Sequence, residues 1–318
     1  MNTIKDTNRL TFENLMNINN DQAREILESF RWPDGVICPK CGSRDVVAIT
    51  GKSEKVRKGL YRCRECRKNN PKQDQFTVTV GTIFESSHIS IRKWLMAIAI
   101  TCASKKGVSA LQLKRMLGLG SYHTAWFMLH RVRYAMKLNP KATMLKGDVE
   151  VDETYIGGKS REGKRGRGSE RKTPVVVLVE RKGRARTKVV THVGSKELKG
   201  VIREVVARDA TIMTDEWRSY QGIGNEYAGH QVVQHGAREY ARGNAHVNNA
   251  ESFFALLKRG IHGIFHSVSV KYLPRYCEEF GFRWNHRLQS DAERAQAVIR
   301  KAEGRRIMFK DLTEKKSV

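Results

Sequence analysis

The spacing of apolar and polar residues divides the chain into a helical first part and a second part of mixed strands and helices. Residues 8–31 repeat apolar side chains at helical intervals in NRLTFENLMN and NNDQAREILESFRW, and WPDG at 32–35 ends the pattern. Residues 89–138 show the same period in ISIRKWLMAIAITCAS, GVSALQLKRMLGL and GSYHTAWFMLHRVRYAMK. A Gly-Leu-Gly turn joins the last two helices, which predicts a helix-turn-helix-like segment.

From residue 147 the pattern becomes that of an α/β domain. DVEVDETYIGG, TPVVVLVERKG and RTKVVTHVG predict three strands, and RKGRA predicts a hairpin between the second and third. A helix (SKELKGVIREVVA), a strand (ATIMTDEW), a helix starting at RSYQGI, a strand (HQVVQHG) and a helix (VNNAESFFALLKRGI) follow. An RNase H-like mixed sheet has this order, although other α/β folds share it.

Four of the six cysteines form two Cys-x-x-Cys pairs separated by 21 residues, namely Cys38, Cys41, Cys63 and Cys66. Two such pairs supply four tetrahedral sulfur ligands, which predicts a zinc ribbon that continues as strand through FTVTVGTIFESS at 76–87. About 50 residues bury little core unaided, so bound zinc would provide much of the stability. Two disulfides are the alternative, which a cytosolic setting disfavours. Cys102 and Cys277 stand alone and are expected in the core.

Charge points to a polyanion as partner. The chain has 59 Lys and Arg against 33 Asp and Glu, a net charge of +26 spread along the sequence. Nucleic acid is the simplest partner for such an excess, and a solvated basic surface is the bland alternative. No apolar run is long enough to span a membrane, and MNTIKDTNRLTFENLMNINN lacks a signal-peptide core. We therefore expect a cytoplasmic, nucleoid-associated protein.

Basic side chains in three segments are candidates for DNA contacts. They are Lys114, Arg115, His123, Arg131 and Arg133 in the helices, Lys164, Arg165 and Arg167 in the Gly-rich loop at 159–172, and Lys258 and Arg259 in the last helix above. Alternatively, the helices form a bundle that links two domains, and the loop only adds solubility. Which N-terminal element reads a DNA sequence stays open.

Three acidic residues lie on or next to the predicted strands and the later helix. Asp152 lies on the first strand, Asp215 ends the fourth strand, and Glu251 begins the later helix. In an RNase H-like sheet the first and fourth strands are neighbours and that helix packs across them, so the three carboxylates can converge. Strand alternation puts Glu150 on the same face as Asp152 and Glu153 on the opposite face. Asp148 and Glu150 therefore compete with Asp152 for the same role.

Converging carboxylates suit metal-dependent phosphoryl transfer. Two Mg²⁺ or Mn²⁺ ions about 3.5–4 Å apart activate the attacking oxygen and stabilise the leaving one, and hard divalent ions prefer carboxylate oxygens. Asp152 would bridge both ions, and Asp215 and Glu251 would each hold one. Lys258 lies two helical turns after Glu251 and would hold a phosphate, and Asn248 shares that helix face. Taken alone, Glu251 and Lys258 are more simply solvent charges.

Several motifs together resemble the insertion-sequence family 1595 transposases of the ISXO2-like type. They are RWPDGVICPKCGS, YRCREC, GVSALQLKRMLG, EVDETYIGGK, TDEWRSY, HVNNAESFFALLKRGIHGIFHSVS and YCEEFGFRWNHR, within residues 15 to 290. The resemblance implies a zinc ribbon, a helical DNA-binding segment and an RNase H-like DDE domain. It places the catalytic acids on Asp152, Asp215 and Glu251, with Lys258 as the lysine after the third acid. Some members use Asn as the third residue, which keeps Asn248 open.

The leading interpretation is an active DNA transposase. It would bind terminal inverted repeats, cleave to free 3′-hydroxyls and join them to target DNA, as a homodimer or larger assembly because two ends are handled together. A non-catalytic zinc-containing DNA-binding protein, such as a domesticated transposase or repressor, is the alternative, and a plain nuclease is a third. Cut-and-paste and replicative pathways both remain open.

The expected organisation is a multidomain α/β (α+β) chain of five segments. They are N-terminal helices at 1–35, a zinc ribbon at 36–88, a helical DNA-binding segment at 89–145, an RNase H-like DDE domain at 146–290 and a basic C-terminal tail at 291–318.

Overall fold

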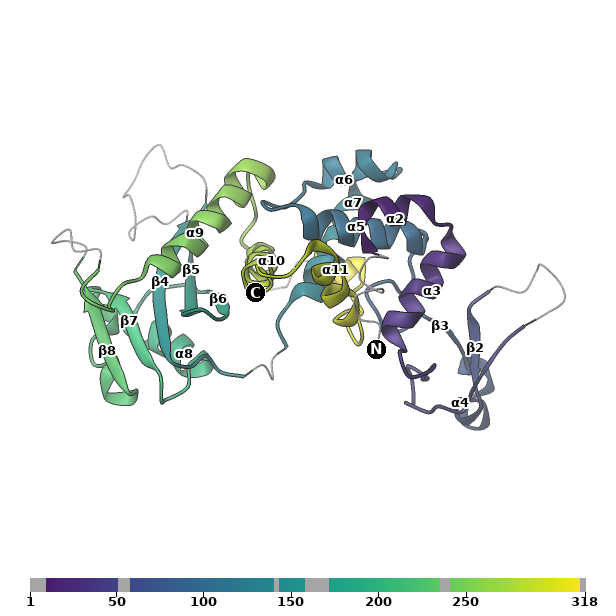
Figure 1. The fold of residues 1–318 in the computed structure, drawn as a ribbon, viewed down its shortest axis with the longest axis horizontal. Coiled ribbons are helices and arrows are strands. Elements are labelled where there is room, and N and C mark those ends of the chain that lie inside the picture. Colours follow the sequence, from purple (N-terminus) through teal and green to yellow (C-terminus); the bar gives the residue numbers. More distant parts are fainter. Residues whose placement is uncertain (1–9, 51–57, 140–142, 158–171, 235–240, 315–318) are drawn as a thin grey trace. The chain divides into compact units, whose positions relative to one another are not determined.

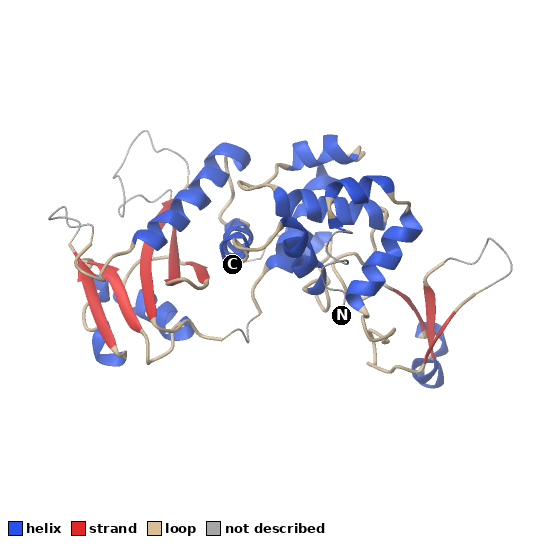
Figure 2. Cartoon of the chain, viewed as in Figure 1, coloured by secondary structure: helices blue, strands red, loops and turns tan. Residues whose placement is uncertain are grey.

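The structure is a computed structural model that describes residues 10–50, 58–139, 143–157, 172–234 and 241–314. The chain forms two compact units, one from Met1–Met136 with Leu288–Val318 and the other from Lys137–Arg287. The first unit combines helices with a three-stranded sheet, and the second has a five-stranded sheet with helices on it (Figure 1 and Figure 2). The fold class expected from the sequence is confirmed.

Helices make up most of the first unit. Five of them precede the linker to the second unit and lie outside the small sheet, namely α2 (Phe12–Asn17), α3 (Asn20–Arg31), α5 (Ile91–Ala103), α6 (Ala110–Leu117) and α7 (Tyr122–Met136). Helix α3 begins with a capping box, in which Asn19 and Gln22 each accept the backbone N–H of the other at 2.9 and 2.8 Å. Helix α6 ends at Gly118, whose φ of 56° is left-handed and suits glycine. The chain then turns into α7, which packs on α6, so the helix-turn-helix-like prediction is confirmed.

The small sheet carries the cysteine pairs. Its strands β1 (Val46–Ala48), β2 (Leu60–Cys63) and β3 (Gln75–Thr77) are antiparallel, and α4 (Arg64–Asn69) and η2 (Pro71–Gln73) lie between β2 and β3. Trp32, Tyr61 and Phe76 pack against one another with ring centroids 5.6–6.0 Å apart. This aromatic cluster is the small core that the sheet shares with the end of α3.

The strand expected through residues 76–87 stops at Thr77. Successive turns replace it, with hydrogen bonds from the N–H of residue 80 to the carbonyl of 77, from 82 to 79 and from 85 to 82. The Thr82 hydroxyl also donates to the carbonyl of Thr79 at 2.6 Å. Threonine hydroxyls that bond to nearby backbone groups compete with strand pairing, which explains the wrong prediction.

The C-terminal segment expected as a basic tail contains α11 (Asp291–Arg300) and α12 (Phe309–Thr313). Helix α11 starts with a capping box between Ser290 and Glu293. It buries Ala295, Val298 and Ile299, which lie three and four residues apart on one face, and packs on α3, α5 and α7. The charged and polar residues around these positions hid this short apolar stripe in the sequence.

The second unit is built on a mixed sheet of five strands in the order β6-β5-β4-β7-β8. The strands are β4 (Asp148–Ile156), β5 (Thr173–Glu180), β6 (Ala185–Val189), β7 (Thr211–Asp215) and β8 (Gly229–Val233). Strands β4, β5 and β6 pair antiparallel, whereas β7 runs parallel to both β4 and β8. This order and direction are those of an RNase H-like sheet.

Helices cover both faces of this sheet and give it two separate cores. On one face, α8 (Ser195–Val205) packs on Val149 and Val151 of β4. On the other, α9 (Asn248–Gly260), η7 (Ile261–Phe265) and α10 (Leu273–Asn285) pack on Val175, Val177 and Val179 of β5. Figure 1 shows α9 running across β4 and β5. Strand alternation therefore directs the even-numbered residues of β4 toward α9.

The helix expected from residue 218 is two short 3₁₀ turns, η4 (Arg218–Tyr220) and η5 (Ile223–Glu226). Gly222 between them has φ 77°, a left-handed conformation that interrupts any continuous helix. Across the described residues, no helix combines the length and the apolar character needed to cross a membrane.

Candidate active site and metal centre

Asp152 and Asp215 lie on two adjacent parallel strands. In the pairing of β4 with β7, Glu150 stands opposite Met213. The same register continued by two residues sets Asp152 opposite Asp215, and neighbouring strands are about 4.8 Å apart. Strand β7 ends at Asp215, where the carboxylate accepts the N–H of Trp217 at 3.1 Å and begins a turn. The fold therefore places these two acids on neighbouring strands.

Helix α9 carries the remaining catalytic candidates on one side. Asn248, Glu251 and Lys258 are all exposed, and their spacing of three and seven residues places them on one face. The opposite side packs on the sheet through Ala250, Phe253, Phe254 and Leu257. Because the apolar side of α9 packs on β4 and β5, the side that carries Asn248, Glu251 and Lys258 faces away from that core.

Asp152 is the acid most affected by its surroundings. Burial, together with the negative charges of Glu153, Asp215 and Glu251, raises the pKa of Asp152 to about 7. The backbone N–H of Glu153 donates to its carboxylate at 2.7 Å and opposes this shift. The three candidate acids are thus close enough to interact electrostatically, and a cation among them would relieve their repulsion.

The acids nevertheless do not form a tight cluster. Among the described residues, only the four-cysteine group contains three or more His, Cys, Asp or Glu donor atoms that all lie within 4.8 Å of one another. Mutual repulsion opposes a closer approach of three carboxylates. Their chemistry still suits a hard divalent cation, since all three offer oxygen donors.

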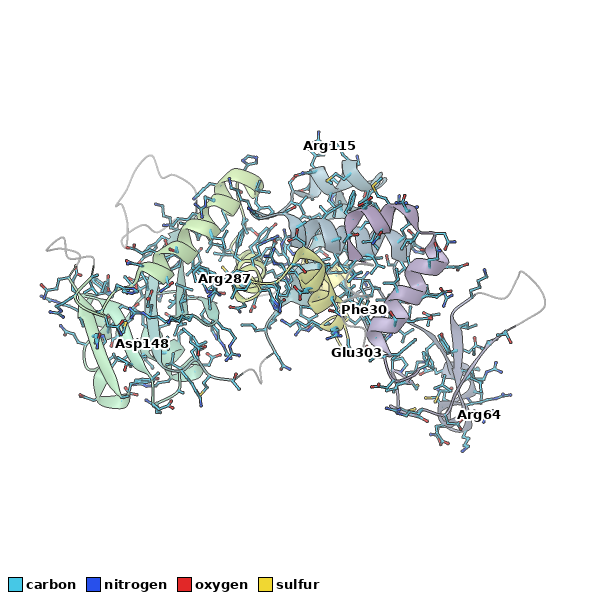
Figure 3. All side chains as sticks on the ribbon, in the orientation of Figure 1. Phe30, Arg64, Arg115, Asp148, Arg287 and Glu303 are labelled. Carbon is cyan, nitrogen blue, oxygen red and sulfur yellow. The ribbon has the colours of Figure 1, made fainter. Side chains whose placement is uncertain are left out.

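The competing acids have other partners. Glu150 is fully buried and accepts the backbone N–H groups of Asn249 and Ala250 at 2.8 and 3.2 Å. Asp148 accepts the Asn244 side-chain amide at 2.8 Å. Figure 3 labels Asp148, which lies at the beginning of β4. Both oxygens of the Glu150 carboxylate are therefore occupied by donors inside the protein.

Glu153 points to the opposite face of the sheet, as alternation predicts. Its carboxylate accepts the hydroxyl of Tyr220 at 2.7 Å, and both side chains are buried. Burial, with the negative charge of Glu153, holds the pKa of Tyr220 well above its ordinary value. Glu216 is exposed beside Asp215.

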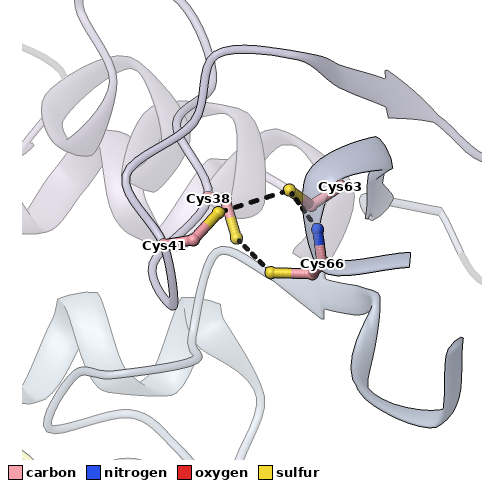
Figure 4. A group of neighbouring side chains, drawn as sticks. All are labelled: Cys38, Cys41, Cys63 and Cys66. Carbon is pink, nitrogen blue, oxygen red and sulfur yellow. Dashed lines mark hydrogen bonds between the residues drawn. The ribbon is translucent and has the colours of Figure 1, made fainter. Parts of the chain in front are cut away.

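The four cysteines of the first unit converge on one point (Figure 4). Cys38 Sγ lies 3.7 Å from Cys66 Sγ, and Cys41 Sγ lies 3.5 Å from Cys63 Sγ. Tetrahedral zinc with Zn–S bonds of about 2.3 Å requires sulfur separations of about 3.8 Å. The backbone N–H of Cys66 points to the sulfur of Cys63 at 3.4 Å. The cluster is consistent with a structural zinc, and none of these cysteines is in a disulfide.

The basic residues expected to contact DNA fall into two groups. Lys114 is half-buried and Arg115 is exposed on α6, where Arg115 projects outward (Figure 3), and His123, Lys258 and Arg259 are exposed. Arg131 and Arg133 are buried instead, at 4% and 2% exposure. They are thus not placed to face phosphates. The loop candidates Lys164, Arg165 and Arg167 lie outside the described residues.

Arg131 stabilises the interior of the first unit. Its guanidinium lies 5.6 Å from the Trp94 ring centroid and 4.9 Å from that of Phe127, and it donates to the carbonyl of Glu85. Burial lowers the pKa of Arg131 to about 10, which still leaves it charged at neutral pH. The helical period alone does not tell an arginine packed on aromatic rings from a solvated one.

Two protein-family models match this chain. The ISXO2-like transposase domain matches residues 144–285, and the transposase zinc-ribbon domain matches residues 18–69. The "Uncharacterized protein in transposable element ISH50" of Halobacterium salinarum is 30% identical over 285 residues, which cover 82% of this chain and 90% of the relative. The chain belongs to the ISXO2-like transposase family.

Other similarities are more limited. An "Uncharacterized transposase-like protein" of Haemophilus influenzae is 28% identical over 100 residues, 31% of this transposase-family chain and 80% of the relative. The crystal structure of a pre-cleavage Mos1 transpososome matches 90% of this chain and 98% of its own at 14% identity. Its TM-score of 0.21 is too low to support an argument.

Sequence reasoning treated Glu150 only as a rival ligand. One signal indicated a different role: α9 of this ISXO2-like protein begins after Val247, which has no side-chain acceptor for the first N–H groups of the helix. Such a helix needs an acceptor from elsewhere in the chain, and a buried carboxylate needs donors.

Proposed function

We propose that this chain is an active DNA transposase that cleaves at the ends of its element and joins them to target DNA. The observation that carries the proposal is the placement of Asp152 and Asp215 on adjacent parallel strands, with Glu251 on α9, which packs on β4. Membership of a transposase family supports the class of reaction. The acids, the lysine and the cysteine pairs of the family motifs are all present in the chain.

The three acids would hold two divalent cations. Asp152 would be a ligand of both ions from β4, Asp215 would hold one from β7, and Glu251 or Asn248 would hold the other from α9. Bound Mg²⁺ or Mn²⁺ supplies charge that activates the attacking oxygen and stabilises the leaving oxygen. Lys258, exposed two turns along α9, would hold a phosphate of the DNA beside the acids.

The proposed reaction has two steps, cleavage and joining. Water attacks a phosphodiester phosphorus at the element end, so that a new P–O bond forms and the bond to the 3′-oxygen breaks, which leaves a 3′-hydroxyl. That hydroxyl then attacks a target phosphodiester, forms a new P–O bond and releases a target 3′-hydroxyl. The chain's residues position the phosphates and neutralise developing charge. Because both ends of the element must be handled at the same time, we propose a homodimer or larger assembly.

The first unit would provide much of the DNA affinity. Arg115, His123 and the zinc ribbon lie in this unit, and the net charge of +26 favours a long polyanion. The ribbon would hold a structural zinc that fixes the two cysteine knuckles. In this proposal the first unit binds the terminal inverted repeats.

A labelled duplex that carries the terminal repeat of the encoding element tests the proposal. Wild-type protein with Mg²⁺ or Mn²⁺ should release a 3′-hydroxyl end and join it to a second duplex. Asp152→Ala should retain DNA binding and lose both products, whereas Glu216→Ala, an exposed acid beside Asp215, should retain both. Tight salt-sensitive binding with no products from wild type would favour a non-catalytic DNA-binding protein, and cleavage without joining would favour a nuclease.

A further inference from the structure

Helix α9 takes its N-terminal cap from a different part of the fold. Val247 stands at the N-cap position and offers no side-chain acceptor. Glu150 of β4 replaces it, since one carboxylate oxygen accepts the N–H groups of Asn249 at 2.8 Å and Ala250 at 3.2 Å. The other oxygen accepts the Asn249 side-chain amide at 2.8 Å. A carboxylate at this position also interacts favourably with the helix dipole.

Arg181 is a further donor that holds the Glu150 carboxylate in place, and His246 lies beside it. Arg181 donates from Nε at 2.9 Å, and Nδ1 of His246 lies 3.1 Å away. Arg181 in turn donates to Asn244 at 2.6 Å and to the carbonyl of His246 at 3.1 Å. The Glu150 side chain is 0% exposed. The segment that leads into α9 is thus bound to β4 through one buried carboxylate.

This anchor lies next to the proposed catalytic acids on both elements. Glu150 and Asp152 are two residues apart on the same face of β4, about 7 Å along the strand. Ala250, whose N–H is bound, directly precedes Glu251. The first turn of α9, with both candidates for the third ligand, is therefore tied to the strand that carries Asp152.

We propose that Glu150 is a positioning residue that fixes the first turn of α9 so that its ligand stays beside Asp152. This inference rests on the proposed function. Glu150 itself does not hold the cation, because both of its oxygens are bound to donors of α9 and Arg181 inside the protein. It acts on the cation through the helix that it caps.

Glu150→Gln tests this role, because it keeps the shape of the side chain and removes the charge that the N–H groups and Arg181 require. Glu279→Gln is the matched control: Glu279 is also 0% exposed in the same unit and binds Arg283 at 2.6 Å within α10. Asn249→Ala removes one donor to Glu150 and serves as the milder second variant. Each protein is measured for amide hydrogen exchange along α9, for metal-free DNA binding and for the Mn²⁺ concentration that gives half-maximal end cleavage.

We expect Glu150→Gln to speed exchange at residues 249–251 and to raise the half-maximal Mn²⁺ concentration by about 10–100-fold, the usual effect of removing a partner of a metal ligand. Asn249→Ala should show a smaller change in the same direction, and metal-free DNA binding should be unchanged. Glu279→Gln should lower thermal stability without either effect.

Faster exchange with an unchanged Mn²⁺ requirement would overturn the positioning role. An equal rise in the requirement for Glu279→Gln would also overturn it, because general destabilisation would then be the cause. If wild type showed no metal-dependent cleavage, the proposed function would fail and the positioning role with it. Exchange along α9 would still report whether Glu150 caps the helix.

Discussion

The hydroxyl of Tyr220 donates a 2.7 Å hydrogen bond to the carboxylate of Glu153, inside the core beneath α8. Glu153 directly follows Asp152, and Tyr220 lies in the short 3₁₀ turn after Asp215. This bond ties the segment after the second candidate acid to the strand of the first. The Glu153–Tyr220 bond lies on one face of β4, and the Glu150 cap of α9 lies on the other. Through these two buried glutamates, β4 holds both the segment after Asp215 and the first turn of α9.

Tyr220→Phe should destabilise the protein by about 1–3 kcal/mol, because it removes a donor from a buried carboxylate. Tyr227→Phe is the control, since the Tyr227 hydroxyl has no hydrogen-bond partner in the described part of the protein. That change should be neutral or slightly stabilising. Urea denaturation measures both, and equal losses for the two variants would contradict the role of the Tyr220–Glu153 bond.

Removing zinc should unfold the ribbon. We expect one zinc per chain, lost in Cys41→Ser, together with faster hydrogen exchange in β2 and in the aromatic cluster around Tyr61, because bound metal supplies folding free energy to such small domains. Cys102→Ala changes a buried cysteine outside the cluster and should keep the full zinc content. Metal analysis of the purified proteins measures this, and a full zinc content in Cys41→Ser would refute the site.

Two arginines of the helical segment should behave in opposite ways. Arg115→Ala should weaken DNA binding, reduce the slope of log affinity against log salt by about 1 and leave stability unchanged, because Arg115 is exposed. Arg131→Ala should cost about 1–3 kcal/mol of stability, because its guanidinium packs between buried rings. Binding titrations at several salt concentrations with thermal melts distinguish them, and an unchanged salt slope for Arg115→Ala would remove it from the interface.

Much of the fold followed from the pattern of residues, and the exceptions have physical causes. The alternation of DVEVDETYI correctly separated Glu150 and Asp152 from Val151 and Glu153, because each face of β4 packs on different helices. The spacing of the two Cys-x-x-Cys pairs correctly predicted the four-sulfur cluster, because each pair forms its own tight turn. Residues 78–87 and the basic C-terminal segment were misread because local threonine bonds and a short apolar stripe decided their structure.

The details of the site depended on long-range contacts. The distance along the chain from Glu150 to Asn249 gives no sign that one caps the helix of the other, and only the packing of α9 on β4 brings them together. For the same reason Arg131 was expected at the surface, since nothing in its immediate sequence shows that Trp94 and Phe127 enclose it.

The most direct test of the proposed active site replaces the central carboxylate with a softer ligand. Asp152→Cys should lose strand joining in Mg²⁺ and recover part of it in Mn²⁺, because a thiolate binds Mg²⁺ poorly and accepts softer metals better. Asp152→Ala should be inactive with both ions, and Glu216→Cys should remain active with both. Strand joining by Asp152→Ala at the wild-type rate in Mg²⁺ would contradict the assignment of Asp152 as a metal ligand of a transposase.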